Sequence, residues 1–552
     1  MNTSSRLSYL YPCPTFIVRD QDKIPNIAVL GSGGSLRAMI ALYGTLTELK
    51  KCNLLDCVMY LCGVSGSTWC MSSLYKNEDW SEKIETLENL QREKLVKGKW
   101  DFIKAKKTVL KAARDENYSL TDFWAYFIVY KLLKELDESK LSDQRKSCEN
   151  GKNPYPIYAA VDKHTYSRHE AGSWFEFTPH NTGVPGIDGN LSTGAYVDMK
   201  ELGSVFREGQ LNEKKNEKTV CYLQGLWGSA LASEKEIKKA IIEALLDFLK
   251  QDRDAYFPSY SKDSDYQNLN ILSKAYQQIL ELQLCVSDVS ASKAEGFFDF
   301  LENILKFNKT SKSYQLLCEM RQNWSTSDPD AREKACMKLW EALNKDFGGK
   351  YSAKETTKDN TVYWISHIYK TNVCLLTWTW GTTSNFLYNM PDVKVPDLKR
   401  KEVVSLIDAG LAINSGYPLV LDPERNVKLI LSFDYSAGDP FETVRKAAEY
   451  CRVHGIKFPK IDESELQDKD NPSNCYIFRG EGLTVMHFPL FNKVNCQDKI
   501  AEYRDTFSTF KLSYTDEEIG KLLLAAKKNV ADVWQKILEE IKHIVDSPSE
   551  TA

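Results

Sequence analysis

Gly63-Val64-Ser65-Gly66-Ser67 follows the apolar run Cys57-Val-Met-Tyr-Leu-Cys62 and precedes a helical pattern from about Thr68. The pattern predicts a strand at 57–62, a sharp turn at Ser65 and a helix near 68–75. Glycines beside a serine allow the tight backbone that lifts a nucleophile clear of the edge of a sheet. A serine between glycines is also common in ordinary turns, so this stretch alone does not establish catalysis.

A second strand–loop–helix unit lies upstream. The apolar run Asn26-Ile-Ala-Val-Leu30 leads into the glycine-rich segment Gly31-Ser-Gly-Gly-Ser-Leu-Arg37, and a helical pattern follows over 38–49. Such a loop is often a phosphate cradle. Here it lacks both the Gly-Lys-Ser/Thr ending of a P-loop and the third glycine of a dinucleotide fingerprint. Two such units side by side supply a nucleophile and free backbone N–H groups, which are the parts that an acyl-transfer enzyme needs.

A serine nucleophile also needs a base. None of the seven histidines lies in a glycine-framed turn at the end of a strand, although His454 and His487 follow apolar segments and are candidates for a triad. Asp408 ends the apolar run that starts at Ser405 and precedes the small residues Ala409 and Gly410. We expect this aspartate to point into a cleft at the carboxyl edge of a sheet; a role as an N-cap or loop residue is the alternative.

These segments together resemble the patatin-like lipid acyl hydrolases and, within them, the cytosolic phospholipase A2 family, most of all its short gamma-type, calcium-independent member. The resemblance runs over nearly the whole chain. Besides the two glycine loops it rests on Asn153-Pro-Tyr-Pro-Ile-Tyr158, Trp174-Phe-Glu-Phe-Thr-Pro179, Gly225-Leu-Trp-Gly-Ser-Ala230, Trp380-Gly-Thr-Thr383, Asp408-Ala-Gly-Leu-Ala-Ile-Asn414 and Leu431-Ser-Phe-Asp-Tyr-Ser-Ala-Gly-Asp-Pro-Phe441.

The resemblance implies an α/β fold of the patatin-like, cytosolic phospholipase A2 catalytic type. In this fold a central, mostly parallel sheet is flanked by helices. We expect one catalytic domain over 1–552 with a largely helical cap or lid inserted at 233–360, where charged amphipathic segments alternate with polar linkers. The helices expected in this insertion are Ser233–Lys250, Leu269–Leu284, Phe297–Phe307 and Ala331–Asp346.

For the site, the resemblance implies a serine–aspartate dyad. Ser65 matches the family nucleophile and Asp408 the family base, and the backbone N–H groups of Gly33, Gly34 and Ser35 match the donors that stabilise the tetrahedral intermediate. Family members often carry glycine at the position of Ser35. No metal ion or cofactor is expected in this chemistry.

Two arginines match family residues near the active site. Arg37 directly follows the glycine loop and is expected to organise the site or to bind phosphate. Arg425 lies in Pro423-Glu-Arg-Asn-Val-Lys-Leu and is expected to contact a headgroup phosphate, for which a guanidinium fork is suited. A structural pair between Arg425 and Glu424 is the alternative.

Composition favours a cytoplasmic enzyme. The 552 residues include 72 basic and 76 acidic ones, a net charge of −4, so no global field attracts nucleic acid or anionic membranes. The 14 cysteines lack paired CxxC spacing and are expected to be reduced thiols; a zinc site among Cys52, Cys57, Cys62 and Cys70 is disfavoured. No signal peptide, transmembrane run or C-terminal prenylation motif is recognisable. Without an N-terminal calcium-binding docking domain before Gly31, we expect weak, reversible contact with intracellular membranes through an apolar rim around the cleft.

Two further helices are predicted outside the insertion. The aromatic stretch 118–133 is expected to be helical after a cap at Ser119 or Thr121. A single C-terminal helix is expected from a cap at Thr515 to about Val545.

Three functions compete at this stage. The first is a calcium-independent phospholipase A2 and lysophospholipase acting on glycerophospholipids and their lyso forms. The second is a lysophospholipid acyltransferase or transacylase that uses the same acyl-enzyme. The third is a lipid-binding protein without activity, which is disfavoured because the serine, the aspartate and the glycine loop are all present. The sequence does not indicate headgroup or acyl-chain preference, or an oligomeric state.

Overall fold

The computed structural model describes residues 24–168, 173–186, 194–229, 234–256, 264–287, 291–348 and 360–546. These residues form two compact units, one drawn from Met1–Phe102, Ile128–Leu231 and Gly381–Ala552 and the other from Ile103–Phe127 and Ala232–Trp380. The chain ends and the predicted linker at 350–360 lie almost wholly outside the described residues, as does part of the linker at 259–266.

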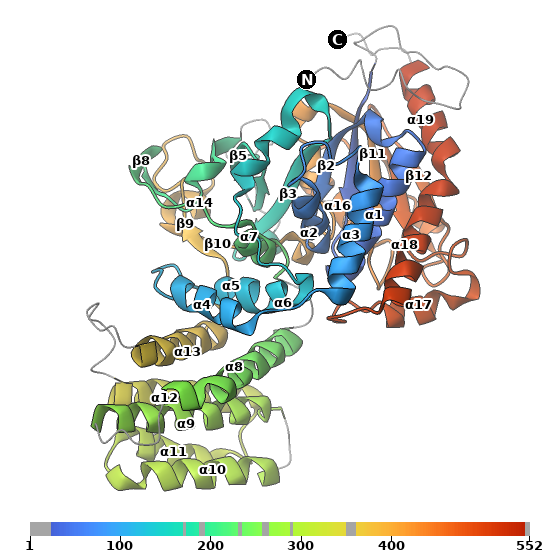
Figure 1. Ribbon diagram of the computed structural model, residues 1–552. Helices are drawn as coiled ribbons and strands as arrows, with labels where there is room; N and C mark the ends of the chain where they lie inside the picture. Colours follow the sequence, from blue (N-terminus) through green and yellow to red (C-terminus); the bar gives the residue numbers. More distant parts are fainter. Residues whose placement is uncertain are drawn as a thin grey trace. The chain divides into compact units, whose positions relative to one another are not determined.

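The first unit is built on a mixed sheet (Figure 1). Its central strands β13, β11, β1, β2 and β3 are parallel neighbours in that order, and antiparallel strands extend it on both sides. The strands of this sheet are β1 (Asn26–Gly31), β2 (Val58–Gly63), β3 (Tyr155–Asp162), β4 (Trp174–Phe177), β5 (Asn181–Val184), β6 (Ala195–Asp198), β9 (Thr382–Ser384), β10 (Val403–Asp408), β11 (Val427–Asp434), β12 (Tyr476–Arg479) and β13 (Thr484–Pro489), and a separate hairpin holds β7 (Val205–Arg207) and β8 (Gln210–Glu213).

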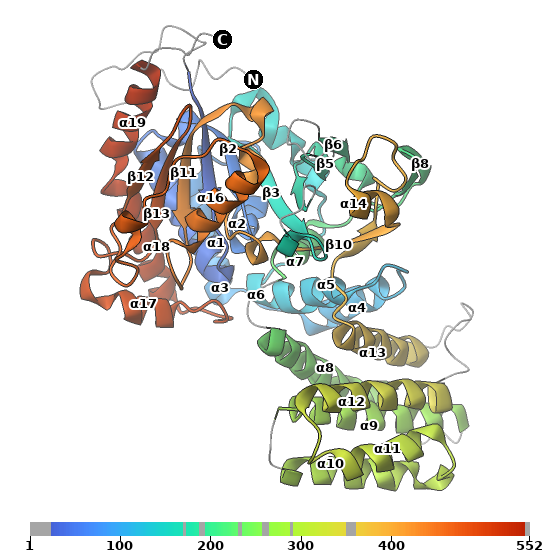
Figure 2. The ribbon, with the colours of Figure 1, turned by 180° about the vertical axis from the view of Figure 1, so that it is seen from behind.

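Helices cover both faces of this sheet, which explains its apolar strands. α1 and α3 lie on one face and α16 on the other (Figures 1 and 2). A strand that is covered on both faces needs apolar side chains on both. β1 is therefore a continuous apolar run, as the sequence predicted, and Ile27 to Leu30 are at most 1% exposed. The helices of this unit are α1 (Ser35–Lys51), α2 (Gly66–Leu74), α3 (Ile84–Lys97), α6 (Tyr130–Leu133), α7 (Val220–Trp227), α14 (Pro396–Arg400), α15 (Tyr417–Val420), α16 (Glu442–His454), α17 (Ile500–Thr506), α18 (Asp516–Ala531) and α19 (Trp534–Asp546).

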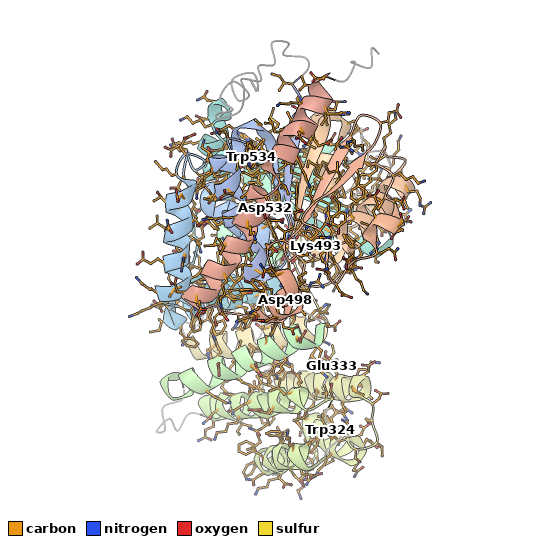
Figure 3. All side chains as sticks on the ribbon, turned by 90° about the vertical axis from the view of Figure 1, so that its right-hand side faces the viewer. Trp324, Glu333, Lys493, Asp498, Asp532 and Trp534 are labelled. Atoms are coloured by element: carbon orange, nitrogen blue, oxygen red, sulfur yellow. The ribbon has the colours of Figure 1, made fainter. Side chains whose placement is uncertain are left out.

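The C-terminal helix was predicted as one element, and that prediction is wrong. The capping box at Thr515 and Glu518 starts α18 as expected, but α18 ends at Ala531 and α19 begins at Trp534. Asp532 and Trp534, labelled in Figure 3, lie at this break. The apolar residues keep a helical period on both sides of the break, so periodicity alone could not reveal it.

The second unit is helical among the residues described. Its helices are α4 (Phe102–Ala112), α5 (Leu120–Phe123), α8 (Glu234–Tyr256), α9 (Ser264–Leu284), α10 (Ala291–Leu305), α11 (Lys312–Asn323), α12 (Pro329–Leu343) and α13 (Asn360–Leu376). α10 and α11 lie together at one end of this unit and α4 and α5 at the other, with α8 and α13 between them (Figures 1 and 2). Tyr276 stacks on Trp340 in its core at 3.8 Å between ring centroids. That residues 233–360 act as a cap or lid stays a prediction.

The aromatic stretch 118–133 is helical, as predicted, but not uniformly α-helical. Ser119 and Asp122 form the capping box of α5, a π-helical segment covers Trp124–Val129, and α6 completes the stretch. Across the described parts of the chain, every helix is too short or too polar to cross a lipid bilayer.

Candidate active site

Ser65 lies on the turn between β2 and α2, in a backbone conformation that few residues adopt. Its φ of 51° and ψ of −122° are strained for a residue with a side chain, and its surface is 4% exposed. A serine at such a strand-to-helix turn is typical of a nucleophile elbow. The turn therefore forms where the sequence predicted it.

Two glycines allow the turn at Ser65 and the glycine-rich loop after β1 to approach closely. A Cβ atom on Gly66 would lie only 1.9 Å from the carbonyl oxygen of Ser35. Gly34 has a φ of 146°, which disfavours any side chain. The hydroxyl of Ser67 donates to the carbonyl of Ser32 at 2.6 Å and joins the two loops.

The pairing of β3 explains how Asp408 reaches Ser65. β4 pairs with β3 along one edge, including Tyr158 and Ala160. Along the other edge, β2 ends with Gly63 opposite Tyr158, and the antiparallel strand β10 ends with Asp408 opposite Ala160. The ends of β2 and β10 therefore meet head-on. Asp408 lies at the carboxyl edge of the parallel strands, as predicted, but it arrives on a strand that runs in the opposite direction.

Asp408 is fixed by its own turn. It is 1% exposed, its Oδ1 accepts the N–H of Gly410 at 2.8 Å, and its backbone N–H donates to the hydroxyl of Ser229 at 3.0 Å. The aspartate is thus also an N-cap, the alternative that the sequence left open, and this role does not conflict with a place in the site.

Ser65 and Asp408 line one pocket of about 230 Å³, which we call the Ser65 pocket. The Ser65 hydroxyl makes no hydrogen bond to any described residue. Catalytic hydrogen bonds are often looser without substrate and tighten in the reacting complex. The described residues lining the Ser65 pocket are Gly33, Gly34, Arg37, Ser65, Asp408, Gly410, Leu411, Asn414, Ser436, Ala437, Gly438 and Thr509, and none of them is a histidine.

The three predicted oxyanion donors are not equivalent. The N–H of Gly33 donates to the backbone oxygen of Asn414 at 3.0 Å. No acceptor among the described residues takes the N–H of Gly34 or of Ser35, at the start of α1. A role for Gly33 as an oxyanion donor stays a prediction, and the hydrogen bond of its N–H to Asn414 does not favour it. The N–H groups of Gly34 and Ser35 could donate to an oxyanion. The N–H of Gly66, which sequence analysis did not consider, likewise has no acceptor in the described part of the chain.

Asn414 is a residue of the site to which sequence analysis gave no role. Its backbone oxygen accepts the N–H of Gly33, and its side-chain amide donates to the Gly33 carbonyl at 3.3 Å and to the Ser436 hydroxyl at 2.9 Å. Both polar groups of the Gly33 backbone are therefore held by one asparagine. The available signal was its place at the end of the matched motif that begins with Asp408.

We expect Asn414→Ala to lower kcat on the order of 10-fold with little change in KM. Loss of the amide leaves the Gly33 carbonyl with the neighbouring Ser32 hydroxyl, at 3.2 Å, and loosens the loop that carries the Gly34 and Ser35 N–H groups. A displaced oxyanion donor costs transition-state stabilisation. Steady-state kinetics of the purified variant measure the effect. Ser436→Ala removes only the other partner of the amide and should leave kcat within about twofold; an equal loss in both variants would contradict the positioning role.

Arg37 is a buried charge that joins the glycine loop to two other segments. Its guanidinium donates to the carbonyls of Tyr435 at 2.6 Å and Phe507 at 2.5 Å and to the Thr509 hydroxyl at 3.2 Å. Burial lowers the pKa of Arg37 to about 10, so it stays protonated at neutral pH. These contacts favour the site-organising alternative for Arg37 over direct phosphate binding.

Arg425 lies outside the Ser65 pocket. Its guanidinium pairs with both carboxylate oxygens of the buried Glu176, at 3.0 and 2.9 Å, and not with Glu424 as the sequence alternative proposed. The ring of Tyr60 lies 5.7 Å away. A headgroup contact by Arg425 stays a prediction, and these contacts do not favour it, because Nη2 of Arg425 pairs with the Glu176 carboxylate and Nη1 donates to the Leu419 carbonyl.

The histidines considered for a triad lie elsewhere. His487 is in β13, fully buried, with Nε2 2.6 Å from the carbonyl oxygen of Pro440. Burial lowers the pKa of His487, which favours its neutral form. His454 ends α16 and packs on Tyr450 at 4.3 Å between ring centroids. Neither histidine lines the Ser65 pocket.

A family model, curated relatives and a solved structure all match this chain. A family model described as "Lysophospholipase catalytic domain" matches residues 27–265. The chain is 38% identical to mouse (Mus musculus) "Cytosolic phospholipase A2 gamma", over 96% of this chain and 87% of the relative. It is 39% identical to the human (Homo sapiens) protein of the same name, over 95% and 90%. A solved structure, "Human GIVD cytosolic phospholipase A2", covers 99% of this chain and 66% of its own with a TM-score of 0.61 and 22% identity, which shows a shared fold.

Proposed function

The chain belongs to the cytosolic phospholipase A2 family, and we propose that it is a calcium-independent phospholipase A2 and lysophospholipase with a serine–aspartate dyad. It is a phospholipid ester hydrolase, as its family and its lysophospholipase catalytic domain indicate. The observation that supports the dyad is that the buried residues Ser65 and Asp408 line one pocket, beside backbone N–H groups for which no described residue is an acceptor. In line with the family name, we place the enzyme in the cytoplasm.

The proposed reaction has two steps. Asp408 takes the proton of Ser65 as the hydroxyl attacks an ester carbonyl, and the N–H groups of Gly34 and Ser35 stabilise the negative charge on the tetrahedral oxygen. Collapse breaks the ester bond, and Asp408 returns the proton to the leaving alkoxide. Asp408 then takes a proton from the water that attacks the acyl-serine. It returns this proton to the Ser65 oxygen as the bond between that oxygen and the acyl carbon breaks and the fatty acid leaves. Every role is assigned to a side chain or a backbone amide, so we propose no requirement for calcium.

A fluorophosphonate probe tests this proposal directly. In the presence of EGTA we expect one equivalent of probe to bind covalently to Ser65, because the trapped phosphonate resembles the charged tetrahedral intermediate. Peptide mapping by mass spectrometry identifies the modified residue, and phospholipid hydrolysis measured in parallel should fall with the extent of labelling. Labelling at another residue, or activity that disappears in EGTA, would contradict the proposal.

The acyl-serine has a second possible acceptor, which defines the alternative function. A lysophospholipid hydroxyl in place of water would make the enzyme a lysophospholipid acyltransferase or transacylase with the same Ser65 and Asp408 chemistry. Product analysis with a labelled lysophospholipid distinguishes the two activities. Diacyl phospholipid formed faster than free fatty acid would favour transfer over hydrolysis.

We also propose weak, reversible membrane contact at the mouth of the Ser65 pocket. Leu411 lines this pocket and is 44% exposed, which gives the rim an apolar side chain. One aliphatic side chain contributes only a modest partition free energy. Tight binding of catalytically inactive protein to neutral vesicles, without other factors, would contradict this part of the proposal.

A further inference from the structure

The turn between α10 and α11 exposes the ring of Phe307. Phe307 is 82% exposed, more than any other large apolar side chain among the described residues, and it lies in the short 3-10 segment Lys306–Asn308. Phe300 of α10, seven residues earlier in the chain, is 40% exposed. A single exposed apolar residue needs no explanation. Two exposed aromatic rings within one short stretch are less usual.

Three lysines lie close to Phe307 in the sequence. Lys306, Lys309 and Lys312 are all exposed, and residues 306–312 contain no acidic side chain. Lys306 donates to Asn303 at 2.6 Å, whereas Lys309 and Lys312 form no ion pair with any described residue. We call residues 306–312 the basic aromatic turn.

Four acidic side chains near the turn already have partners, whereas Glu319 of α11 is exposed and forms no ion pair with a described residue. Glu295, Asp299 and Glu302 of α10 all accept from Arg321 of α11, at 2.6, 2.7 and 2.8 Å. Asp346 accepts the backbone N–H of Ser313 at 3.0 Å. These contacts reduce, although they do not cancel, the negative field around the turn, so the unpaired ammonium groups of Lys309 and Lys312 remain available to an anionic surface.

Leu524 is also an exposed apolar residue, but the lysines near it are paired. Leu524 on α18 is 67% exposed and also has lysines near it in the sequence. Lys521 pairs with Glu517 at 2.8 Å, Lys527 pairs with Glu88 at 2.6 Å, and Lys528 donates to the Val494 carbonyl at 2.8 Å. Exposure without unpaired positive charge makes Leu524 a matched control.

We propose that the basic aromatic turn is a docking surface for anionic phospholipid membranes. Phe307 enters the boundary between headgroups and acyl chains, and Lys309 and Lys312 contact lipid phosphates or carboxylates. The aromatic ring suits the apolar acyl-chain region of a bilayer, and the lysines suit its anionic headgroups. The inference rests on the proposed membrane contact of the enzyme but not on its dyad, and it assigns that contact to a second place in the chain.

Vesicle co-sedimentation of the full chain tests the proposal, with phosphatidylcholine vesicles containing or lacking phosphatidylserine. Phe307→Ser should lower the partition coefficient on phosphatidylserine vesicles on the order of 10-fold, from lost ring burial. Lys309→Gln combined with Lys312→Gln should lower it on the order of 10-fold and remove most of its salt dependence. Leu524→Ser should stay within about twofold of the unchanged protein.

Ester hydrolysis, vesicle binding and analytical ultracentrifugation together distinguish failure of the proposed function from failure of the docking surface. Hydrolysis of a soluble, monomeric ester by the unchanged chain tests the proposed function alone, because residues 306–312 do not line the Ser65 pocket. Its absence would contradict the proposed function and not the docking surface, and the same activity in every variant shows that each variant is folded. Unchanged vesicle binding in Phe307→Ser would overturn the docking surface. So would a wild-type dimer that Phe307→Ser converts to a monomer in analytical ultracentrifugation, because the turn would then be a contact between copies of this chain.

Discussion

Ser65→Ala is expected to lower kcat on phospholipid and lysophospholipid esters by about 10⁶-fold, the cost typical of removing a catalytic serine. Without the hydroxyl no acyl-enzyme forms, and only water held near the Gly34 and Ser35 N–H groups can attack the ester. The free energy of unfolding should stay within about 0.5 kcal/mol, because the Ser65 hydroxyl makes no hydrogen bond to a described residue and its removal breaks none. Steady-state assays and denaturant unfolding of the same preparations measure both effects.

Ser73→Ala is the matched control for this variant. Ser73 lies on the same helix α2 and is half-buried, and its hydroxyl contacts Gln91 at 3.4 Å and makes a hydrogen bond with Tyr43. We expect nearly full activity and no fluorophosphonate adduct at this position. Full activity in Ser65→Ala would reject the nucleophile, and an equal loss in both variants would point to a disturbed helix rather than to lost chemistry.

The elements beside the site could be predicted because their signals are local. The strands expected at 26–30 and 57–62 are β1 (Asn26–Gly31) and β2 (Val58–Gly63), and the helices expected after them are α1 and α2. Continuous apolar runs that end in glycine turns specify buried parallel strands without reference to the rest of the chain. The mostly parallel sheet flanked by helices, implied by the family resemblance, is confirmed.

What could not be predicted depends on pairing between distant segments. The apolar run before Asp408 predicts a strand but not its direction, and only the ladder with β3 shows that β10 is antiparallel. The sequence likewise could not show that Asn414 takes both polar groups of Gly33, or that Glu176 rather than Glu424 pairs with Arg425. Each of these contacts joins residues far apart in the chain, so no local pattern encodes it.

Asp408→Asn is expected to lower kcat by about 10³- to 10⁴-fold with little change in KM. The amide is nearly the same size as the carboxylate, and its oxygen can still accept the N–H of Gly410, now made at 2.8 Å. It cannot take a proton from Ser65 or from water, so both steps of the proposed reaction lose their base. Slow fluorophosphonate labelling of Ser65 in this variant, followed by mass spectrometry, separates the loss of the base from the loss of the pocket.

Asp422 provides a control that few sites offer, because it repeats the local structure of Asp408. Each aspartate is the N-cap of a 3-10 turn, with φ and ψ of −52° and 122° at Asp408 and −54° and 123° at Asp422, and each accepts the N–H two residues later. Asp422→Asn therefore perturbs the same kind of turn outside the Ser65 pocket, and we expect its kcat to stay within about twofold. A large loss at Asp408 alone then reports on proton transfer and not on turn stability. Equal losses at both aspartates, or a comparable loss in a folded His454→Gln variant, would remove Asp408 as the base.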